Sequence, residues 1–117
     1  MQQTDTIPAD IRVLSEQIYQ YKKGVRQMVL CTFPERYESL AIKKLSSQAI
    51  DYIVQPVGNG RINLYFGRKA CVEAIQYIIS RPLSDISPEE DFILGALLRY
   101  DITMQCERYC KRKGQRN

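Results

Sequence analysis

The loop at residues 58–60, Gly-Asn-Gly, constrains the fold of this chain more than any other short segment. It separates residues 50–57 and 61–66, two runs rich in β-branched and aromatic residues. Glycine and asparagine readily adopt the positive φ angles that tight β-hairpin loops require. The second run alternates apolar and polar side chains, so one face of that strand should be buried and the other more polar. We therefore predict a β-hairpin with one buried face.

Helical periodicity of apolar residues and one further β-branched run predict the remaining elements. We expect helices over residues 8–23, 34–48 and 68–81, a strand over residues 25–33, and a long final helix from residue 88 to residue 113. The final helix has the clearest start, because Ser87 and Glu90 form a Ser-x-x-Glu capping box and Pro88 suits the first helical position.

This order of elements predicts an α+β fold with a three-stranded antiparallel sheet. A right-handed crossover followed by the hairpin places the third strand between the other two. Residues 1–113 should form a single α+β domain, because the chain contains no internal linker or repeat. Residues 114–117 should form a flexible tail.

The chain of 117 residues contains no histidine. Histidine is the usual general base and the commonest metal ligand, so its absence excludes catalytic triads and mixed cysteine and histidine zinc sites. Any catalyst would need to rely on Cys71, a carboxylate or a bound cofactor. We therefore expect a protein without enzymatic activity, with no catalytic residue, no cofactor and no metal.

Four cysteines raise the question of a metal or redox site. On a continuous helix, Cys106 and Cys110 would have Cβ atoms about 5–6 Å apart, which is too far for a disulfide. A four-thiolate metal site would also need Cys31 and Cys71, without the C-x-x-C spacing that usually builds such sites. Cys71 either lies in the first turn of its helix as a favoured thiolate or packs in the core as a small apolar residue. Both interpretations of Cys71 stay open.

The hydropathy of the chain bears on its location. No apolar run approaches the ~20 residues that a membrane-spanning helix needs, and the N-terminal residues are too polar for a signal peptide. We therefore expect a cytoplasmic protein whose thiols stay reduced.

The predicted final helix is apolar on two sides. One stripe we assign to the core of the chain: Ile93, Leu97, Tyr100 and Met104. The opposite stripe is a candidate dimer interface: Leu94, Leu98, Ile102 and Tyr109. A domain of this size cannot bury both stripes against its own chain, so a two-fold homodimer would cover the second one. The alternative is that the first helix folds over it.

The polar face of the predicted hairpin is a candidate surface for a ligand or a protein partner. Its residues supply hydrogen-bond donors, an acceptor and an aromatic ring: Gln55, Arg61, Asn63 and Tyr65. Tyr100 and Asp101 interrupt the apolar final helix with a hydrogen-bonding pair, and we include them in the same candidate surface. The alternative is an ordinary solvated face of an antiparallel sheet.

The net charge of +4 is concentrated at the C-terminus. Residues 1–98 carry eleven cationic and eleven acidic side chains, whereas residues 99–117 carry six cationic and two acidic ones. The candidate contacts with an acidic partner are Arg108, Lys111, Arg112 and Lys113. Cations near the end of a helix are also expected from the helix dipole, and no nucleic-acid-binding motif is present, so we do not expect nucleic acid as a partner.

Several blocks of this chain resemble an uncharacterised bacterial family, DUF2023. The blocks lie at residues 55–58, 61–67, 87–95, 100–101 and 105–109, and the resemblance extends from about Leu14 to Gly114. It implies a small α+β domain of three strands and about five helices that forms a homodimer, with no established activity. It also implies a gene neighbourhood with flavodoxins. Cys110 is not part of the family block, which argues further against a paired-cysteine site.

Together these observations suggest a non-enzymatic, cytoplasmic, homodimeric interaction or accessory protein associated with flavodoxin-type electron transfer. Flavodoxins are acidic, so one of them could bind the cationic C-terminal segment by electrostatic complementarity. The alternative is a small-ligand or cofactor-binding domain that uses the polar sheet face and the cleft of the dimer.

Overall fold

The computed structural model describes residues 7–81, 83–98 and 101–115. Its strands are β1 (Met28–Pro34), β2 (Asp51–Gly58) and β3 (Arg61–Gly67). Its helices are α1 (Ala9–Lys22), α2 (Glu38–Ser46), α3 (Lys69–Ile79), α4 (Pro88–Leu97) and α5 (Ile102–Gly114), with short 3-10 turns η2 (Glu35–Tyr37) and η3 (Leu83–Asp85). None of the helices in these described ranges is long and apolar enough to cross a membrane.

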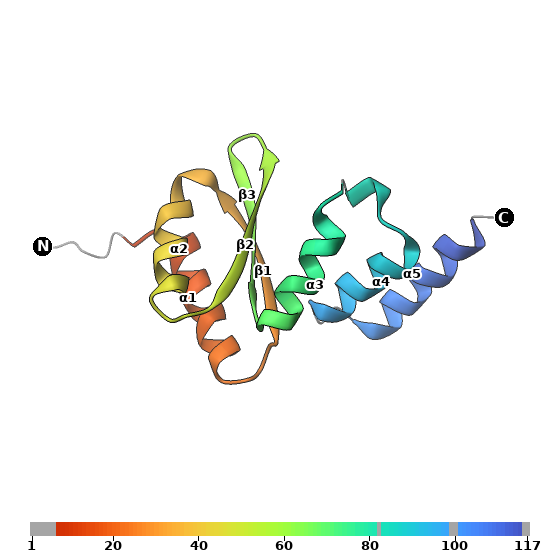
Figure 1. Ribbon diagram of the computed structural model, residues 1–117, viewed down its shortest axis with the longest axis horizontal. Coiled ribbons are helices and arrows are strands. Elements are labelled where there is room, and N and C mark those ends of the chain that lie inside the picture. The colour runs from red at the N-terminus through yellow and green to blue at the C-terminus, as the bar shows by residue number, and fades with distance from the viewer. Residues whose placement is uncertain (1–6, 82, 99–100, 116–117) are drawn as a thin grey trace, which may run out of the picture.

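The elements are arranged along one long axis (Figure 1). Helices α1 and α2 lie at one end, the sheet and α3 lie in the middle, and α4 and α5 lie side by side at the other end. The predicted α+β class is confirmed. The α1–α2 end and the α4–α5 end of the molecule therefore present two separate surfaces.

The sheet has the predicted topology, with the order β1-β3-β2 and β3 antiparallel to both neighbours. The loop between β2 and β3 uses the positive φ angles that its composition predicted: 91° at Gly58, 55° at Asn59 and 70° at Gly60. A register shift between Pro56 and Gly58 forms a bulge next to this loop. The predicted hairpin is confirmed.

One face of β3 packs under α1 and α2. Ile62, Leu64 and Phe66 point to this side and are fully buried. They join a core with residues from α1, β1, α2 and the segment before β2: Ile11, Leu14, Ile18, Val29, Phe33, Ala41, Leu45 and Ile50. This larger core places α1 against α2.

The opposite face of β3 packs under α3 and α4. Here Tyr65 of β3 and Met28 of β1 form a second, smaller core with Ile75 of α3 and Leu98. Leu98 is the C-terminal cap residue of α4, and Arg26 Nη2 donates a hydrogen bond to its carbonyl at 3.3 Å. The small core therefore attaches the C-terminal half of the chain to the sheet.

The C-terminal region differs from the prediction of one long helix, which is wrong. Helix α4 ends at Leu97, and α5 begins at Ile102 with Asp101 as its N-cap. The Asp101 carboxylate accepts a hydrogen bond from the Met104 backbone N–H at 3.0 Å, as aspartate commonly does at helix starts. The new start allows α5 to fold back along α4 instead of extending it.

Gly95 permits the close packing of α4 and α5. A Cβ atom at this position would lie 2.2 Å from Oε1 of Gln105 on α5. A larger residue would therefore displace the end of the Gln105 side chain, which lies directly over the α4 backbone at this position.

We predict that Leu98→Ala lowers the free energy of unfolding by about 2–5 kcal/mol, because it leaves a cavity in the small core. Leu98 is 2% exposed, whereas Val13 of α1 is 57% exposed. The control Val13→Ala should therefore change stability by about 0.5 kcal/mol or less. Urea unfolding followed by circular dichroism measures both. A loss at Leu98 that vanishes on dilution would show that the side chain serves an interface between chains instead.

Candidate functional site

The predicted polar sheet face forms a ladder of hydrogen bonds across all three strands. Thr32, Asn63 and Gln55 are direct neighbours in register on β1, β3 and β2. Thr32 Oγ1 donates to Asn63 Oδ1 at 2.6 Å, and Asn63 Nδ2 donates to Gln55 Oε1 at 3.1 Å. Tyr65 OH donates to the same Gln55 oxygen at 3.0 Å. The ladder links the exposed part of this face to the small core.

Most residues of the predicted ligand surface make contacts that stabilise the fold. The Tyr65 side chain is 1% exposed, so its ring packs in the small core and cannot stack on a ligand. Arg61 lies next to the ladder and donates to the Thr32 carbonyl at 3.4 Å. Asp101 caps α5 instead of joining this group, and Tyr100 lies outside the described residues. A ligand site on this face stays a prediction.

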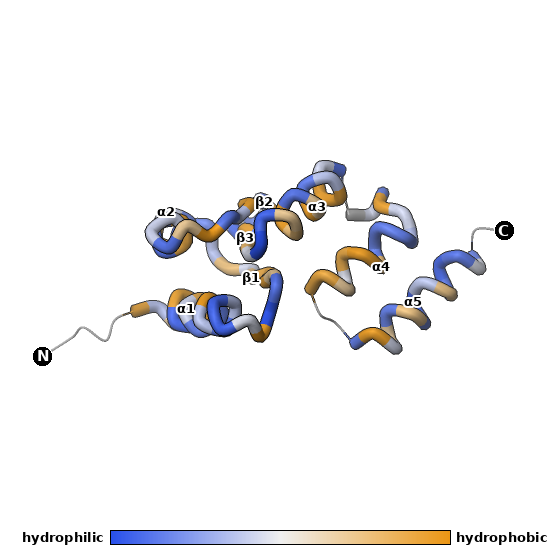
Figure 2. The backbone as a smooth tube through the Cα atoms, turned by 60° about the horizontal axis from the view of Figure 1, so that its bottom comes forward, coloured by the Kyte–Doolittle hydropathy of each residue, from blue (hydrophilic) through white to orange (hydrophobic). Residues whose placement is uncertain are grey.

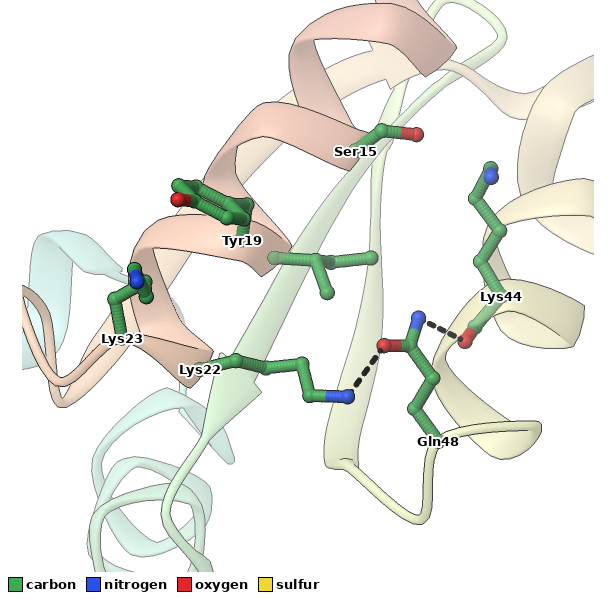
Figure 3. A pocket seen from close by; sticks show the side chains of 7 residues that line it. Ser15, Tyr19, Lys22, Lys23, Lys44 and Gln48 are labelled. Carbon is green, nitrogen blue, oxygen red and sulfur yellow. Dashed lines mark hydrogen bonds between the residues drawn. The ribbon is translucent and has the colours of Figure 1, made fainter.

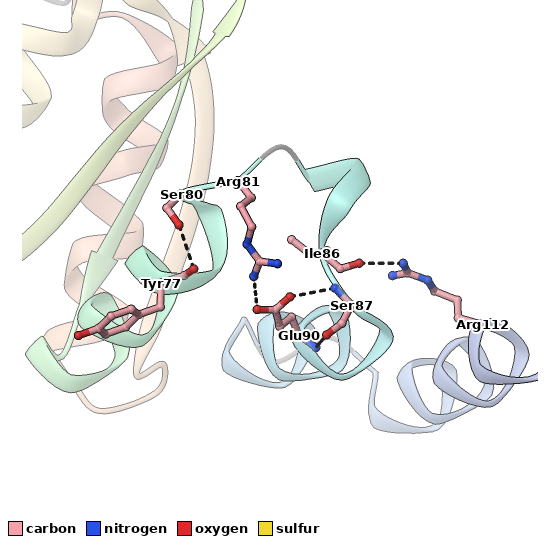
Figure 4. A network of polar contacts seen from close by, with 7 residues as sticks. All are labelled: Tyr77, Ser80, Arg81, Ile86, Ser87, Glu90 and Arg112. Carbon is pink, nitrogen blue, oxygen red and sulfur yellow. Dashed lines mark hydrogen bonds and ion pairs between the residues drawn. The ribbon is translucent and has the colours of Figure 1, made fainter. Parts of the chain in front are cut away.

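One polar network holds the N-terminus of α4 between α3 and α5 (Figure 4). Glu90 Oε1 accepts from the Ser87 N–H at 2.9 Å and Ser87 Oγ accepts from the Glu90 N–H at 3.0 Å, which confirms the predicted capping box. Arg81 pairs with the Glu90 carboxylate, and Arg112 donates to the Ile86 carbonyl at 3.1 Å. The hydrogen bond from the Ser87 backbone, together with Arg81, lowers the pKa of Glu90. The charged carboxylate therefore stabilises this junction.

Three of the C-terminal cations that the structure describes bind carboxylates at the start of α4. Arg108 Nε lies 2.7 Å from Asp91 Oδ2, and Arg112 Nη1 lies 3.7 Å from Asp91 Oδ1. Lys113 Nζ lies 2.7 Å from Glu89 Oε2. The hydrogen bond from Lys113 lowers the pKa of Glu89 from 4.5 to about 2. Three of the four cations predicted to contact an acidic partner are thus paired within the chain.

This pairing changes the distribution of positive charge. Residues 86–117 carry six cationic and five acidic side chains, so the α4–α5 hairpin and its flanks are close to neutral. Of the four predicted contacts, only the Lys111 side chain forms no ion pair within the described ranges. An acidic partner at this end stays a prediction, and it would meet less net charge than the sequence suggests.

An open apolar groove runs between α4 and α5. Its volume is about 480 Å³, and it is lined by Glu89, Phe92, Ile93, Cys106, Tyr109 and Cys110. The Phe92 and Tyr109 rings meet edge to face at 5.7 Å between centroids. Figure 2 shows the apolar character of α4 beside the more mixed α5. The hairpin therefore presents a preformed apolar surface at the end of the molecule.

The residues of the predicted dimer stripe have separate locations. Tyr109 lines the groove, and the exposed Ile102 lies one helical turn before Cys106 on α5. Leu94 and Leu98 instead pack in the small core of their own chain. The break between α4 and α5 resets the helical phase, so a stripe drawn through a continuous helix combines residues from two different faces.

The predicted core stripe is divided in the same way. Ile93 lines the open groove and is 46% exposed, and Met104 is also exposed. Leu97 packs against the small core, and Tyr100 lies outside the described residues. The exposed apolar surface of the hairpin thus includes residues that the sequence assigned to the core.

The four cysteines are free and lie in three different environments. Cys31 Sγ donates to Gln17 Oε1 at 2.6 Å, and burial raises the pKa of this thiol to about 12. Cys71 packs against the small core, which favours its apolar interpretation. Cys106 and Cys110 are exposed along the apolar groove. Within the described part of the chain, no three histidine, cysteine, aspartate or glutamate residues are placed to hold a metal ion.

A second groove lies between α1 and α2, and the sequence analysis missed it (Figure 3). Its volume is about 410 Å³, and it is lined by Ser15, Ile18, Tyr19, Lys22, Lys23, Lys44 and Gln48. Lys22 Nζ donates to Gln48 Oε1 at 3.0 Å, and Lys23 Nζ lies 5.5 Å from the centroid of the Tyr19 ring. The sequence showed lysines at the ends of two helices, but it did not show that these helices lie side by side.

The comparison with protein families matches residues 12–112 to the family described as Protein of unknown function (DUF2023). The chain belongs to this family. The DUF2023 match extends from α1 into α5, so it includes both grooves and the polar ladder. No curated protein matches the sequence.

We predict that Cys31 resists alkylation at pH 8, whereas Cys106 and Cys110 react readily. The pKa of Cys31 is raised to about 12, so almost none of it is the reactive thiolate at this pH, and its side chain is partly buried. Iodoacetamide labelling followed by peptide mass spectrometry measures the rate at each thiol. Equal rates in the folded protein would contradict the placement of Cys31; in denaturant, all the thiols should react.

We predict that the Glu89 carboxylate titrates near pH 2 in the folded protein, instead of near 4.5. A lowered pKa in the folded state means that the contribution of Glu89 to stability is present above pH 4.5 and is lost as the pH falls toward 2. A carbon-detected NMR titration of glutamate side chains measures this midpoint. In Lys113→Gln it should move up toward 4.5. A midpoint that does not change in this variant would contradict the ion pair.

Proposed function

We propose that this protein is a non-enzymatic, homodimeric interaction or accessory protein whose α4–α5 hairpin forms the dimer interface. The observation that carries this proposal is the open apolar groove of the hairpin. Exposed apolar residues continue along both of its helices, with Ala96 on α4 and Ile102 on α5. Contiguous apolar surfaces of this kind commonly mark sites of protein association.

A second copy of the chain is an occupant that fits this groove. Two hairpins related by a two-fold axis would form a four-helix arrangement, which is a common way for helix pairs to bury apolar stripes. The ion pairs of Glu89 and Asp91 with α5 already fix the hairpin in each copy. Little conformational entropy would then be lost on association, which favours binding.

The chemistry of the described residues supports a role without catalysis. Among the described residues, three groups have clearly shifted pKa values: Cys31, Glu89 and Glu90. Burial raises the pKa of the Cys31 thiol. A hydrogen bond from Lys113 of α5 lowers the pKa of Glu89, and the hydrogen bond of the α4 capping box lowers the pKa of Glu90. A shifted pKa with a structural cause does not indicate an active site.

We also propose that the protein acts in the cytoplasm with an acidic partner, such as a flavodoxin. The four free cysteines fit a reducing compartment. The net charge of +4 favours association with an acidic protein through long-range electrostatic attraction. The alternative of a small-ligand site on the polar sheet face has less support, because the polar side chains of the ladder already form hydrogen bonds with one another.

We predict that the protein elutes with twice its chain mass of 13.6 kDa in size-exclusion chromatography with light scattering at micromolar concentration. Ile93→Asp should shift it to the monomer, because a charge would then have to be buried in the groove interface. The matched control is Val13→Asp, since Val13 is an exposed apolar residue of α1 at the other end of the molecule.

The control should remain a dimer, and all the variants should keep the circular dichroism of the wild type. A wild-type protein that stays monomeric at these concentrations would refute the dimer. A dimer that survives Ile93→Asp would place the interface elsewhere.

A further inference from the structure

The groove between α1 and α2 has a cationic end and an apolar end. The cationic end holds Lys22, Lys23 and Lys44 (Figure 3). It continues into an adjoining hollow of about 700 Å³ that includes Ile7 and Leu40. The two hollows share Ser15, Tyr19 and Lys44. They therefore form one groove along two neighbouring helices.

The lysines of this groove have no carboxylate partner among the described residues. Lys22, Lys23, Lys43 and Lys44 make no ion pair within the described part of the chain. The ends of α1 and α2 lie here too, and each helix C-terminus carries about half a negative elementary charge. The three lysines that line this end, Lys22, Lys23 and Lys44, exceed that sum about threefold, so this end of the groove stays positive.

The other end of the groove exposes apolar side chains. Ile7, Tyr19 and Leu40 each leave about half of their surface in contact with solvent. Arg12 and Glu16 line this end as well, and Arg12 donates to the Ile7 carbonyl at 2.8 Å. A ligand that fits the whole groove needs apolar groups at one end and negative groups at the other.

We propose that this groove binds an acidic, amphipathic segment of a partner protein. Apolar side chains of the segment would cover Tyr19 and Leu40, and its carboxylates would lie beside Lys22 and Lys44. Helix α1 has 14 residues and is about 21 Å long, so the groove can accommodate a helical segment of similar length. This is the groove mode of peptide recognition, in which an amphipathic segment buries its apolar side.

Other occupants match the groove less well. Nucleic acid binding usually draws on many phosphate contacts, whereas the apolar end of this groove is lined mainly by apolar side chains and also carries the carboxylate of Glu16. A membrane surface would favour apolar residues that protrude, but these line a hollow between helices. A second copy of the chain is a poorer match, because its acidic residues Glu89 and Asp91 already form ion pairs with its own α5.

The proposal extends the proposed interaction role by naming a class of partner, yet its test does not depend on the dimer. The groove lies on α1 and α2, whereas the proposed dimer interface lies on α4 and α5 at the other end of the molecule. Light scattering of each variant will show whether the dimer state has changed. Failure of either proposal can thus be recognised separately.

The test uses a fluorescein-labelled peptide with leucine and glutamate at helical spacing and the full 117-residue chain. Two further peptides separate the apolar contribution to binding from the electrostatic one. In one of them, serine replaces leucine, and in the other, lysine replaces glutamate. Fluorescence anisotropy should show saturable binding of the first peptide and at least about tenfold weaker binding of the other two. Amide NMR shifts should change along α1 and α2.

Two double variants with equal loss of charge locate the site. Lys22→Gln with Lys44→Gln removes two lysines of the groove, and it should weaken binding by about tenfold. Arg68→Gln with Lys69→Gln removes two exposed cations outside it, and it should change binding less than about twofold. Glutamine keeps a high helix propensity, so both variants should retain the fold.

Three results would overturn the proposal. These are the absence of saturable binding, equal weakening by the two double variants, and NMR shifts confined to α4 and α5. Vesicles rich in phosphatidylserine and a single-stranded RNA serve as rival probes. Tighter binding of either probe than of the acidic peptide, lost in the Lys22→Gln and Lys44→Gln variant, would assign the groove to that ligand instead.

Discussion

The structure depends on the burial of the central strand β3 from both sides. Ile62, Leu64 and Phe66 belong to a large core under α1 and α2, whereas Tyr65 on the other face belongs to a small core under α3 and α4. Helix α5 contributes no residue to either core among the described residues. It is held to α4 by ion pairs and a close crossing, and this leaves one side of the hairpin apolar and open.

The same packing decides which charges remain available. The three acidic residues that begin α4 face the cations of α5 and of the segment after α3, so charge at this end is largely compensated. At the opposite end, the large core places the lysine-bearing ends of α1 and α2 together, and Lys22, Lys23 and Lys44 form no ion pair within the described residues. The fold thus pairs three of the C-terminal cations and leaves the lysines of the α1–α2 groove without ion pairs among the described residues.

The correct predictions from sequence concern features with a local cause. The hairpin at residues 58–60 follows from residues that accept positive φ, and the capping box follows from Ser87 and Glu90 three positions apart. The prediction of one long C-terminal helix was wrong because Asp101 can start a helix as well as interrupt one. The two predicted apolar stripes were wrong for the same reason, since both assumed a continuous helix. Tyr65 was assigned to a polar face, although the length of its side chain lets the ring pack in a core while the hydroxyl reaches Gln55.

The sequence alone determined the α+β class, the strand order, the start of α4 and the absence of histidine chemistry, because each depends on residue type or on spacing along the chain. Only the tertiary structure decided that α5 folds back on α4, that three of the C-terminal cations are paired, and that two lysine-bearing helix ends form one groove. These features join residues far apart in sequence. Their energies depend on distances between side chains, and those distances exist only once the two cores have formed.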